Sequence, residues 1–202
     1  IKKNSSLLRN VSMERINVEL NKILLSEVPS EGIENLIVTD LITYIMPELK
    51  DIIGFNQHNP HHDKDVFHHT MAVLDSTEPD LILRLAALLH DVGKPHSFTI
   101  DKDNIGHFYN HHKKGMEMAG EILKRLKYDK KTIDAVKILV KEHMNKLNET
   151  THKSVKRLIN RVGVDNTARL FKLQIADIKG SKMPHDFSNI VRTIKLYEKI
   201  LK

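Results

Sequence analysis

Residues 81–95 read LILRLAALLHDVGKP. The first nine are apolar on nearly every face, with Arg84 as the exception, and a helix that is apolar all round normally lies at the centre of a bundle. The glycine and proline that follow are strong signals that the helix stops. We therefore predict a central helix that ends at His90 and Asp91, so that both polar side chains emerge beside the core.

Helical periodicity continues on both sides of this segment. Ser12 is placed to cap a first helix, and Pro29 opens a second, which we expect to continue until Pro47 ends it. No convincing pair of alternating strands is found, and the polar stretch from Phe98 to His107 is expected to form a turn or a small hairpin. The predicted fold class is all-α: a helical bundle preceded by a small N-terminal helical subdomain.

The composition is that of a globular protein, with 202 residues, 40% hydrophobic and 29% charged. We place a boundary near Gly54, between an N-terminal helical segment (1–53) and a His-rich remainder (54–202), with a polar loop from Gly54 to Asp65. No apolar run is long enough to cross a bilayer, so no membrane partner is expected. Because the sequence begins at Ile1 without a Met or a signal-like segment, we expect a piece of a longer polypeptide or a trimmed chain.

The sequence contains no Cys, which excludes disulfides, thiolate metal sites and Cys nucleophiles and fits a cytoplasmic location. A net charge of +6 allows a polyanionic partner such as RNA, although on charge alone a Lys-rich solvated surface is the favoured explanation. The 13 His residues are more informative, since many lie between His58 and His143 and imidazole is the commonest protein ligand for transition metals. The composition therefore indicates metal chemistry.

Two carboxylates occupy unusual positions. Asp91 follows the most apolar helix of the chain, where a charge without a partner would carry a large desolvation penalty. Asp177 lies one turn beyond Leu173 and two turns beyond Leu170, which places it on an apolar stripe. An acid in such a position must be paired, coordinated or protonated. A divalent cation with further ligands would satisfy both residues.

Three histidines follow the same pattern. His143 lies one turn after Leu139, His69 lies one turn before Val73, and His111 is positioned to approach the same centre. Taken singly, an inward His is more often a hydrogen-bonded core residue. An inward Asp more often caps a helix or pairs with a basic residue, and Arg84 or Lys94 could pair with Asp177. Several inward His and Asp residues on separate helices favour a shared site.

Imidazole and carboxylate ligands without thiolates suit Mn, Fe, Ni, Co or Mg better than structural zinc. Such an ion lowers the pKa of bound water and polarises a phosphoryl oxygen. Lys94 is expected to neutralise a substrate phosphate, and His111 and His143 to contact that phosphate, to donate to the leaving oxygen or to hold a second metal. The predicted catalytic residues are His90, Asp91, Lys94, His111 and His143.

At this point a family pattern becomes recognisable. The order His69, His90-Asp91, His111, His143 and Asp177 resembles that of the HD phosphohydrolase superfamily, and residues 88–95 look like its core motif. The resemblance implies an HD-domain helical bundle over residues 54–202. It also implies metal ligands at His69, His90, Asp91 and Asp177, with His111 and His143 completing the pocket.

A second resemblance extends over nearly the whole chain. Several segments are similar to the post-catalytic region of bacterial CCA-adding tRNA nucleotidyltransferases and poly(A) polymerases. They are 11–16, Glu19-Leu20, Pro47-Glu48-Leu49, Gln57, 62–70, and 108–111 with Gly115. The resemblance implies that residues 1–53 form an RNA-binding neck and body, and that the HD domain carries phosphodiesterase and phosphatase activity on nucleotides.

The nucleotidyltransferase head of that family, with its Gly-Ser segment and paired aspartates, is absent from this sequence. The nearest imitation, Asp101-Lys102-Asp103, lacks the preceding Gly-Ser and is interpreted as a turn. We therefore expect that this chain alone does not add nucleotides to RNA.

Three functions remain open from the sequence. The first is a divalent-metal-dependent phosphohydrolase acting on a nucleotide, a cyclic nucleotide or an RNA-end phosphate. The alternative is the tRNA-binding C-terminal part of a CCA-adding nucleotidyltransferase or poly(A) polymerase whose HD site is secondary or vestigial. The third is a metal-bound regulatory module without turnover. The sequence fixes neither the metal, nor the substrate, nor the oligomeric state.

Overall fold

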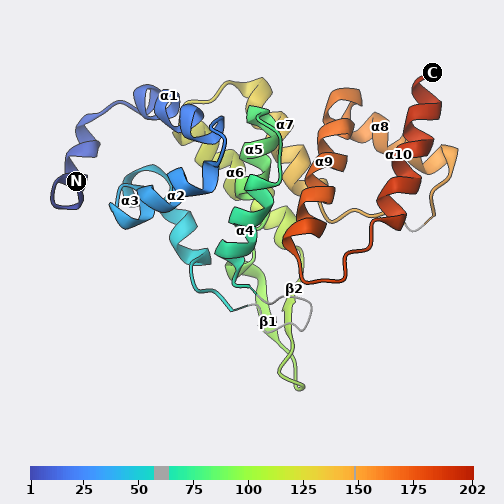
Figure 1. The fold of residues 1–202 in the computed structure, drawn as a ribbon, viewed down its shortest axis with the longest axis horizontal. Helices are drawn as coiled ribbons and strands as arrows, with labels where there is room; N and C mark the ends of the chain where they lie inside the picture. The colour runs from blue at the N-terminus through green and yellow to red at the C-terminus, as the bar shows by residue number, and fades with distance from the viewer. Residues whose placement is uncertain (57–63, 148) are drawn as a thin grey trace.

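The computed structural model describes residues 1–56, 64–147 and 149–202, and these are mostly helical (Figure 1). Part of the predicted loop at 54–65, and with it Gln57, His62 and Asp63, lies outside the described residues. The elements are η1 (Lys2–Asn10), α1 (Met13–Leu24), α2 (Pro29–Val38), α3 (Ile42–Ile45), η2 (Pro47–Ile52), α4 (Val66–Asp75), α5 (Leu81–Leu89), η3 (Pro95–Ser97), β1 (Phe98–Ile100), β2 (Gly106–Phe108), α6 (His111–Arg125), α7 (Lys130–Glu142), α8 (His152–Val162), α9 (Val164–Gly180) and α10 (Ser188–Leu201). The predicted all-α class is confirmed.

Helix α5 lies at the centre of the bundle, as its composition predicts. It packs against α1, α4, α7 and α9, and its leucines and alanines between Leu83 and Leu89 are buried. Asp80 caps its first turn by accepting a hydrogen bond from the amide of Leu83 at 3.0 Å. The apolar surface of α5 therefore holds four other helices around the point where the chain reaches His90.

Arg84 is the one charged residue of α5, and it is buried. Its guanidinium donates hydrogen bonds to the carbonyl oxygens of Leu24, Ser26 and Thr77. Arg84 therefore joins the end of α1 to the start of α5, and this structural role replaces the pairing with Asp177 that the sequence left open.

The helix predicted from Pro29 to Pro47 is interrupted, so that prediction is wrong in its length. Helix α2 ends at Val38, and Asp40 adopts a left-handed backbone conformation with φ of 59°. The carboxylate of Asp40 accepts a hydrogen bond from the hydroxyl of Thr43 at 2.6 Å, at the start of α3. The β-branched residues Val38 and Thr39, followed by Asp40, disfavour continuation of α2, because the Asp40 side chain instead stabilises the start of α3.

The short hairpin β1–β2 occupies the predicted polar stretch. Its strands are antiparallel, with Phe98 opposite Phe108, and these rings pack near Phe55 at one end of the bundle. Asp101 accepts hydrogen bonds from the amides of Asp103 and Ile105 in the connection. The acidic pair is therefore part of a turn, as the sequence analysis proposed.

The N-terminal segment is attached to the bundle by polar contacts at several points. Asp75 at the end of α4 accepts hydrogen bonds from the amide and hydroxyl of Ser30, in the first turn of α2. Arg125 forms a two-point ion pair with Glu48, with N–O distances of 2.8 and 2.7 Å.

Among the described residues, no helix is both long enough and apolar enough to span a membrane.

A further contact between the bundle and the N-terminal segment, from Tyr128 to Asn21, gives a pH-dependent prediction. The hydroxyl of Tyr128 donates to Oδ1 of Asn21, and burial raises the pKa of Tyr128 above its usual value. Because the unfolded pKa is about 10, the neutral hydroxyl stabilises the fold fully below pH 10, and this contribution is lost as the pH rises above 10. Between pH 9 and 11 we expect urea denaturation to show a loss of about 1 kcal/mol in wild type beyond that in Tyr128→Phe. Equal pH dependence in both proteins would contradict this assignment.

Candidate metal centre

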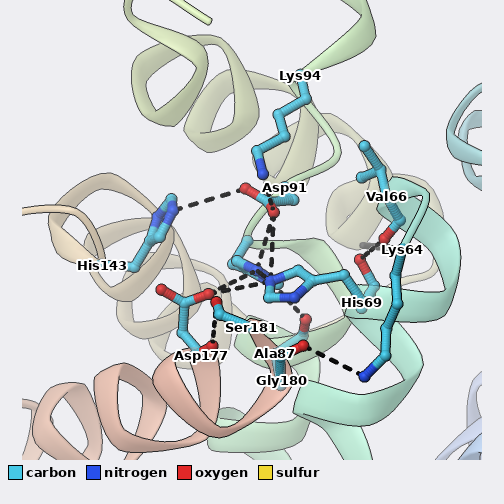
Figure 2. Close-up of polar contacts among 12 residues, drawn as sticks. Lys64, Val66, His69, Ala87, Asp91, Lys94, His143, Asp177, Gly180 and Ser181 are labelled. Carbon is cyan, nitrogen blue, oxygen red and sulfur yellow. Dashed lines mark hydrogen bonds and ion pairs between the residues drawn. The ribbon is translucent and has the colours of Figure 1, made fainter. Parts of the chain in front are cut away.

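Seven polar residues predicted from the sequence lie together in the middle of the bundle. They are His69 on α4, His90, Asp91 and Lys94 after α5, His111 at the start of α6, His143 after α7, and Asp177 on α9. Figure 2 shows Asp91 in the centre of this group, with Lys94, His143 and His69 around it and Asp177 on the adjacent helix. All except Asp177 are buried, and Asp177 is partly exposed.

Three of the histidines are oriented by the backbone carbonyl group three residues earlier in the chain. Nδ1 of His90 lies 2.8 Å from the carbonyl oxygen of Ala87, and Nδ1 of His111 lies 2.9 Å from that of Phe108. The corresponding distance from His143 to Val140 is 2.7 Å. A carbonyl oxygen only accepts, so Nδ1 carries the proton in the neutral ring and the lone pair of Nε2 points to the centre. This is the usual way in which a ligating imidazole is held.

The donors form two separate groups of three. In the first, His69, His90 and Asp177 offer atoms that all lie within 4.8 Å of one another. In the second, the same holds for Asp91, His111 and His143. Each group contains only nitrogen and oxygen donors, which suits borderline and hard divalent cations.

Asp91 connects the two groups through its two carboxylate oxygens. Oδ2 lies 3.2 Å from Nε2 of His90 and 3.7 Å from Nε2 of His69. Oδ1 lies 3.5 Å from Nε2 of His111 and 3.7 Å from Nε2 of His143. Each oxygen therefore faces a different group.

The pKa shifts place most donors in their ligating state at neutral pH. Burial lowers the pKa of His143 to about 3 and also lowers that of His111, so both rings are neutral. Burial alone would raise the pKa of Asp91, but His90 and Lys94 outweigh it and hold the carboxyl well below its usual range. The pKa of Asp177 is likewise lowered, since the hydrogen bond from His69 and the charge of His90 outweigh burial.

His90 shows the opposite shift. Burial disfavours its protonation, but Asp91 and Asp177 outweigh this effect and raise its pKa above 6.5. The two carboxylates thus favour positive charge at the centre of a buried site. A divalent cation requires the same electrostatic environment.

Lys94 adds a buried positive charge beside Asp91. Its ammonium lies 2.8 Å from Oδ2 of Asp91 and 5.3 Å from the ring centroid of Phe108, and it is only 6% exposed. The side chain lines a cavity of about 480 Å³ together with Asp91, His111, His143 and Asp177. Pockets of this size accommodate small ligands such as nucleotides.

Other residues that line this cavity were not identified from the sequence. Lys146 follows α7, whereas Ser181 and Lys182 follow α9. Nothing in the local sequence marks them, because they reach the cavity only through the packing of α9 against α4 and α7. The charged and imidazole residues of the cavity are thus predictable from the sequence, whereas Lys146, Ser181 and Lys182 are not.

Two glycines allow the close packing around the centre. A Cβ atom at Gly93 would lie 2.4 Å from the carbonyl oxygen of His111 and 2.6 Å from the amide nitrogen of Gly115. A Cβ atom at Gly180 would lie 2.8 Å from Cγ2 of Val73 and 3.2 Å from Nδ1 of His69. The absence of a side chain at these positions brings α6 and α9 against the ligands.

A second cavity, of about 490 Å³, lies in the N-terminal segment. Its lining is mainly aliphatic, with Glu14, Arg15 and Glu19 at its charged positions and no histidine. It therefore lacks the donors of the central site. Of the two, only the central cavity has the chemistry of a metal site.

The class of protein follows from this arrangement and from comparison with known families. The model of the HD domain family matches residues 48–179, and the chain belongs to that family. Its His and Asp cluster fits a divalent metal site, while the identity of the metal is not determined by these donors. A second family model, described as the probable RNA- and SrmB-binding site of polymerase A, matches residues 1–53.

The chain is also similar to several individual proteins, including two tRNA nucleotidyltransferases. The chain is 38% identical over 140 residues to the A-adding tRNA nucleotidyltransferase of Deinococcus radiodurans, covering 66% of this chain and 32% of that protein. It is 34% identical over 143 residues to the CC-adding enzyme of Thermus thermophilus, covering 67% and 32%. With the multifunctional CCA protein of Pasteurella multocida it shares 29% over 191 residues, covering 87% and 45%. The predicted relationship to tRNA nucleotidyltransferases is confirmed, and the chain spans a third to a half of these relatives.

Proposed function

We propose that this chain binds tRNA, as the RNA-binding and HD-domain part of a protein related to tRNA nucleotidyltransferases. The observation that carries this proposal is the match of residues 1–53 to an RNA-binding family, together with the similarity of the chain to tRNA nucleotidyltransferases. A cytoplasmic location accords with that role and remains a prediction. In this proposal residues 1–53 act as the neck, and residues 54–202 form the HD domain.

The charges at the beginning of the N-terminal segment support the proposal, although residues 1–53 as a whole contain eight acidic and six basic residues. η1 contains no acidic residue, and its basic side chains Lys2, Lys3 and Arg9 are exposed. Helix α1 adds Arg15 and Lys22, both exposed, although Lys22 pairs with Glu19 at 2.7 Å. Phosphate contacts by such side chains provide most of the sequence-independent affinity for RNA.

The tRNA proposal predicts that removing basic side chains from α1 weakens tRNA binding and reduces its dependence on salt. Arg15→Gln with Lys22→Gln is expected to weaken binding of a tRNA transcript and to reduce the slope of log affinity against log salt by about 1 to 2. The matched control is Lys130→Gln with Lys131→Gln on α7, which removes the same charge from another surface. Binding curves by fluorescence anisotropy over a salt series measure the effect. An affinity equal to that of the control pair would argue against an RNA-binding neck.

A second candidate function is metal-dependent phosphoester hydrolysis at the HD site. It is favoured by one specific observation: two groups of three donors lie close together, and Asp91, His111, His143 and Asp177 from them line a cavity of nucleotide size. In this proposal His69, His90 and Asp177 would hold one divalent ion, and Asp91, His111 and His143 would hold a second. The substrate is a phosphoester of a nucleotide, a cyclic nucleotide or an RNA end.

The side chains then have separate roles. When bound, the ions would supply Lewis-acid polarisation of a phosphoryl oxygen and activation of water. Lys94 contributes a fixed positive charge beside Asp91, where it offsets negative charge that develops on the phosphate. His111 and His143 are assigned as ligands rather than proton donors, because their lowered pKa values keep them neutral near pH 7.

A further inference from the structure

We propose that the outer face of α8 is a second RNA-binding surface, which contacts the phosphate backbone of a folded RNA. This inference rests on the proposed binding of tRNA, but it concerns a surface outside residues 1–53 and outside the HD cavity. Figure 1 shows α8 with α10 at the end of the molecule opposite η1 and α1.

The charge of α8 is of one sign. Its sequence, HKSVKRLINRV, contains Lys153, Lys156, Arg157 and Arg161 and no acidic residue. They give α8 a charge of +4, whereas the net charge of the entire chain is +6. The helix therefore carries most of the excess positive charge within 11 residues.

The helical repeat places the basic side chains of α8 on the face opposite its buried apolar residues. Val155, Leu158 and Val162 are buried against α9 and α10. Lys153, Lys156, Arg157 and Asn160 are exposed, and their spacing of three and four residues places them on one stripe. This stripe is about 10 Å long, the axial length of about three phosphates on one strand.

Three of the four charges face solvent. Arg161 forms an ion pair with the buried Glu142 at 2.9 Å. Within the part of the chain that the structure describes, no ion pair involves Lys153, Lys156 or Arg157. Like charges three and four residues apart destabilise a helix, so the arrangement does not serve its stability.

A Lys-rich solvated surface does not account for this pattern. The exposed faces of α6, α7 and α10 are also Lys-rich, but each includes acidic residues: Glu117 and Glu121, Asp134, and Glu198 respectively. General enrichment in lysine would leave α8 mixed in the same way. An exposed stripe of cations without acids fits a polyanionic backbone, and RNA is the polyanion to which the family match already points.

The test replaces Lys153, Lys156 and Arg157 together by Gln in the full chain and measures affinity for a tRNA transcript over a salt series. We expect at least about tenfold weaker binding near 0.15 M salt and a salt slope reduced by about 2 to 3. The control with Lys124, Lys130 and Lys131 changed to Gln, at the α6–α7 corner, removes the same charge and should change both quantities less. A variant with Lys153→Arg and Lys156→Arg should bind like wild type, and helical circular dichroism verifies the fold of each protein.

The outcomes separate this inference from the proposal on which it rests. If wild type binds tRNA and the α8 variant matches the α6–α7 control, the α8 surface is refuted while the neck remains. If wild type does not bind tRNA at all, both proposals are overturned. A selective loss in the α8 variant, restored when the charges return as arginine, supports the second surface.

Discussion

Replacing Asp91 by Asn is expected to abolish the binding of divalent metal at both donor groups. Oδ1 and Oδ2 of Asp91 face different donor groups, so this carboxylate is the one ligand that both ions would share. An amide keeps the size of the side chain but loses the negative charge and one oxygen donor. We therefore expect hydrolysis of bis-p-nitrophenyl phosphate with added Mn, Ni, Co or Mg to fall by about 100-fold or more. The helical circular dichroism spectrum should persist.

The control for this prediction is Asp177→Asn. Asp177 belongs only to the group with His69 and His90, so this change should leave the second group intact. Elemental analysis should show a partial loss of metal in Asp177→Asn and a nearly complete loss in Asp91→Asn. Full metal occupancy in Asp91→Asn would remove this residue from the site.

Gly93→Ala is expected to have the largest effect on stability. The new methyl group would approach backbone atoms of His111 and Gly115 at 2.4 and 2.6 Å, and a backbone cannot rotate away as a side chain can. Helix α6 would have to shift, which we expect to cost about 3 kcal/mol of unfolding free energy. Because His111 begins α6, metal binding should weaken as well.

Gly120→Ala provides a matched control on α6. There the Cβ atom would meet Cδ of Lys137 at 3.1 Å, the middle of a flexible side chain. Alanine is also the better helix former, so we expect a change within about 1 kcal/mol of wild type and in the stabilising direction. Denaturant unfolding measures both variants, and equal stabilities would show that the contact at Gly93 is not tight.

The sequence allows the central helix and the inward donors to be predicted because both depend on local periodicity. The apolar residues of α5 specify a buried position, and the stripe Leu170, Leu173 places Asp177 on the inner face of α9. The same periodicity orients His143. Residues on five separate elements could thus be assigned to one centre before their distances were known.

Features that depend on tertiary packing were not predictable in this way. The break between α2 and α3 depends on Asp40, whose side chain stabilises a new helix start instead of the old helix. The buried position of Arg84 is explained by the carbonyl oxygens of Leu24 and Ser26, from a distant segment, together with that of Thr77. The division of donors into two groups depends on how the Asp91 carboxylate is turned, and no spacing in the sequence specifies that angle.

The most direct test of the central claim is the number of divalent ions that wild type binds. The protein would be stripped with a chelator, dialysed against Mn²⁺ near pH 7.5, and analysed for bound metal by elemental analysis. Two complete donor groups joined by Asp91 predict close to two ions per chain, with the number reduced in Asp177→Asn and His143→Ala. Binding of no ion by wild type would contradict the assignment of these residues as a metal centre.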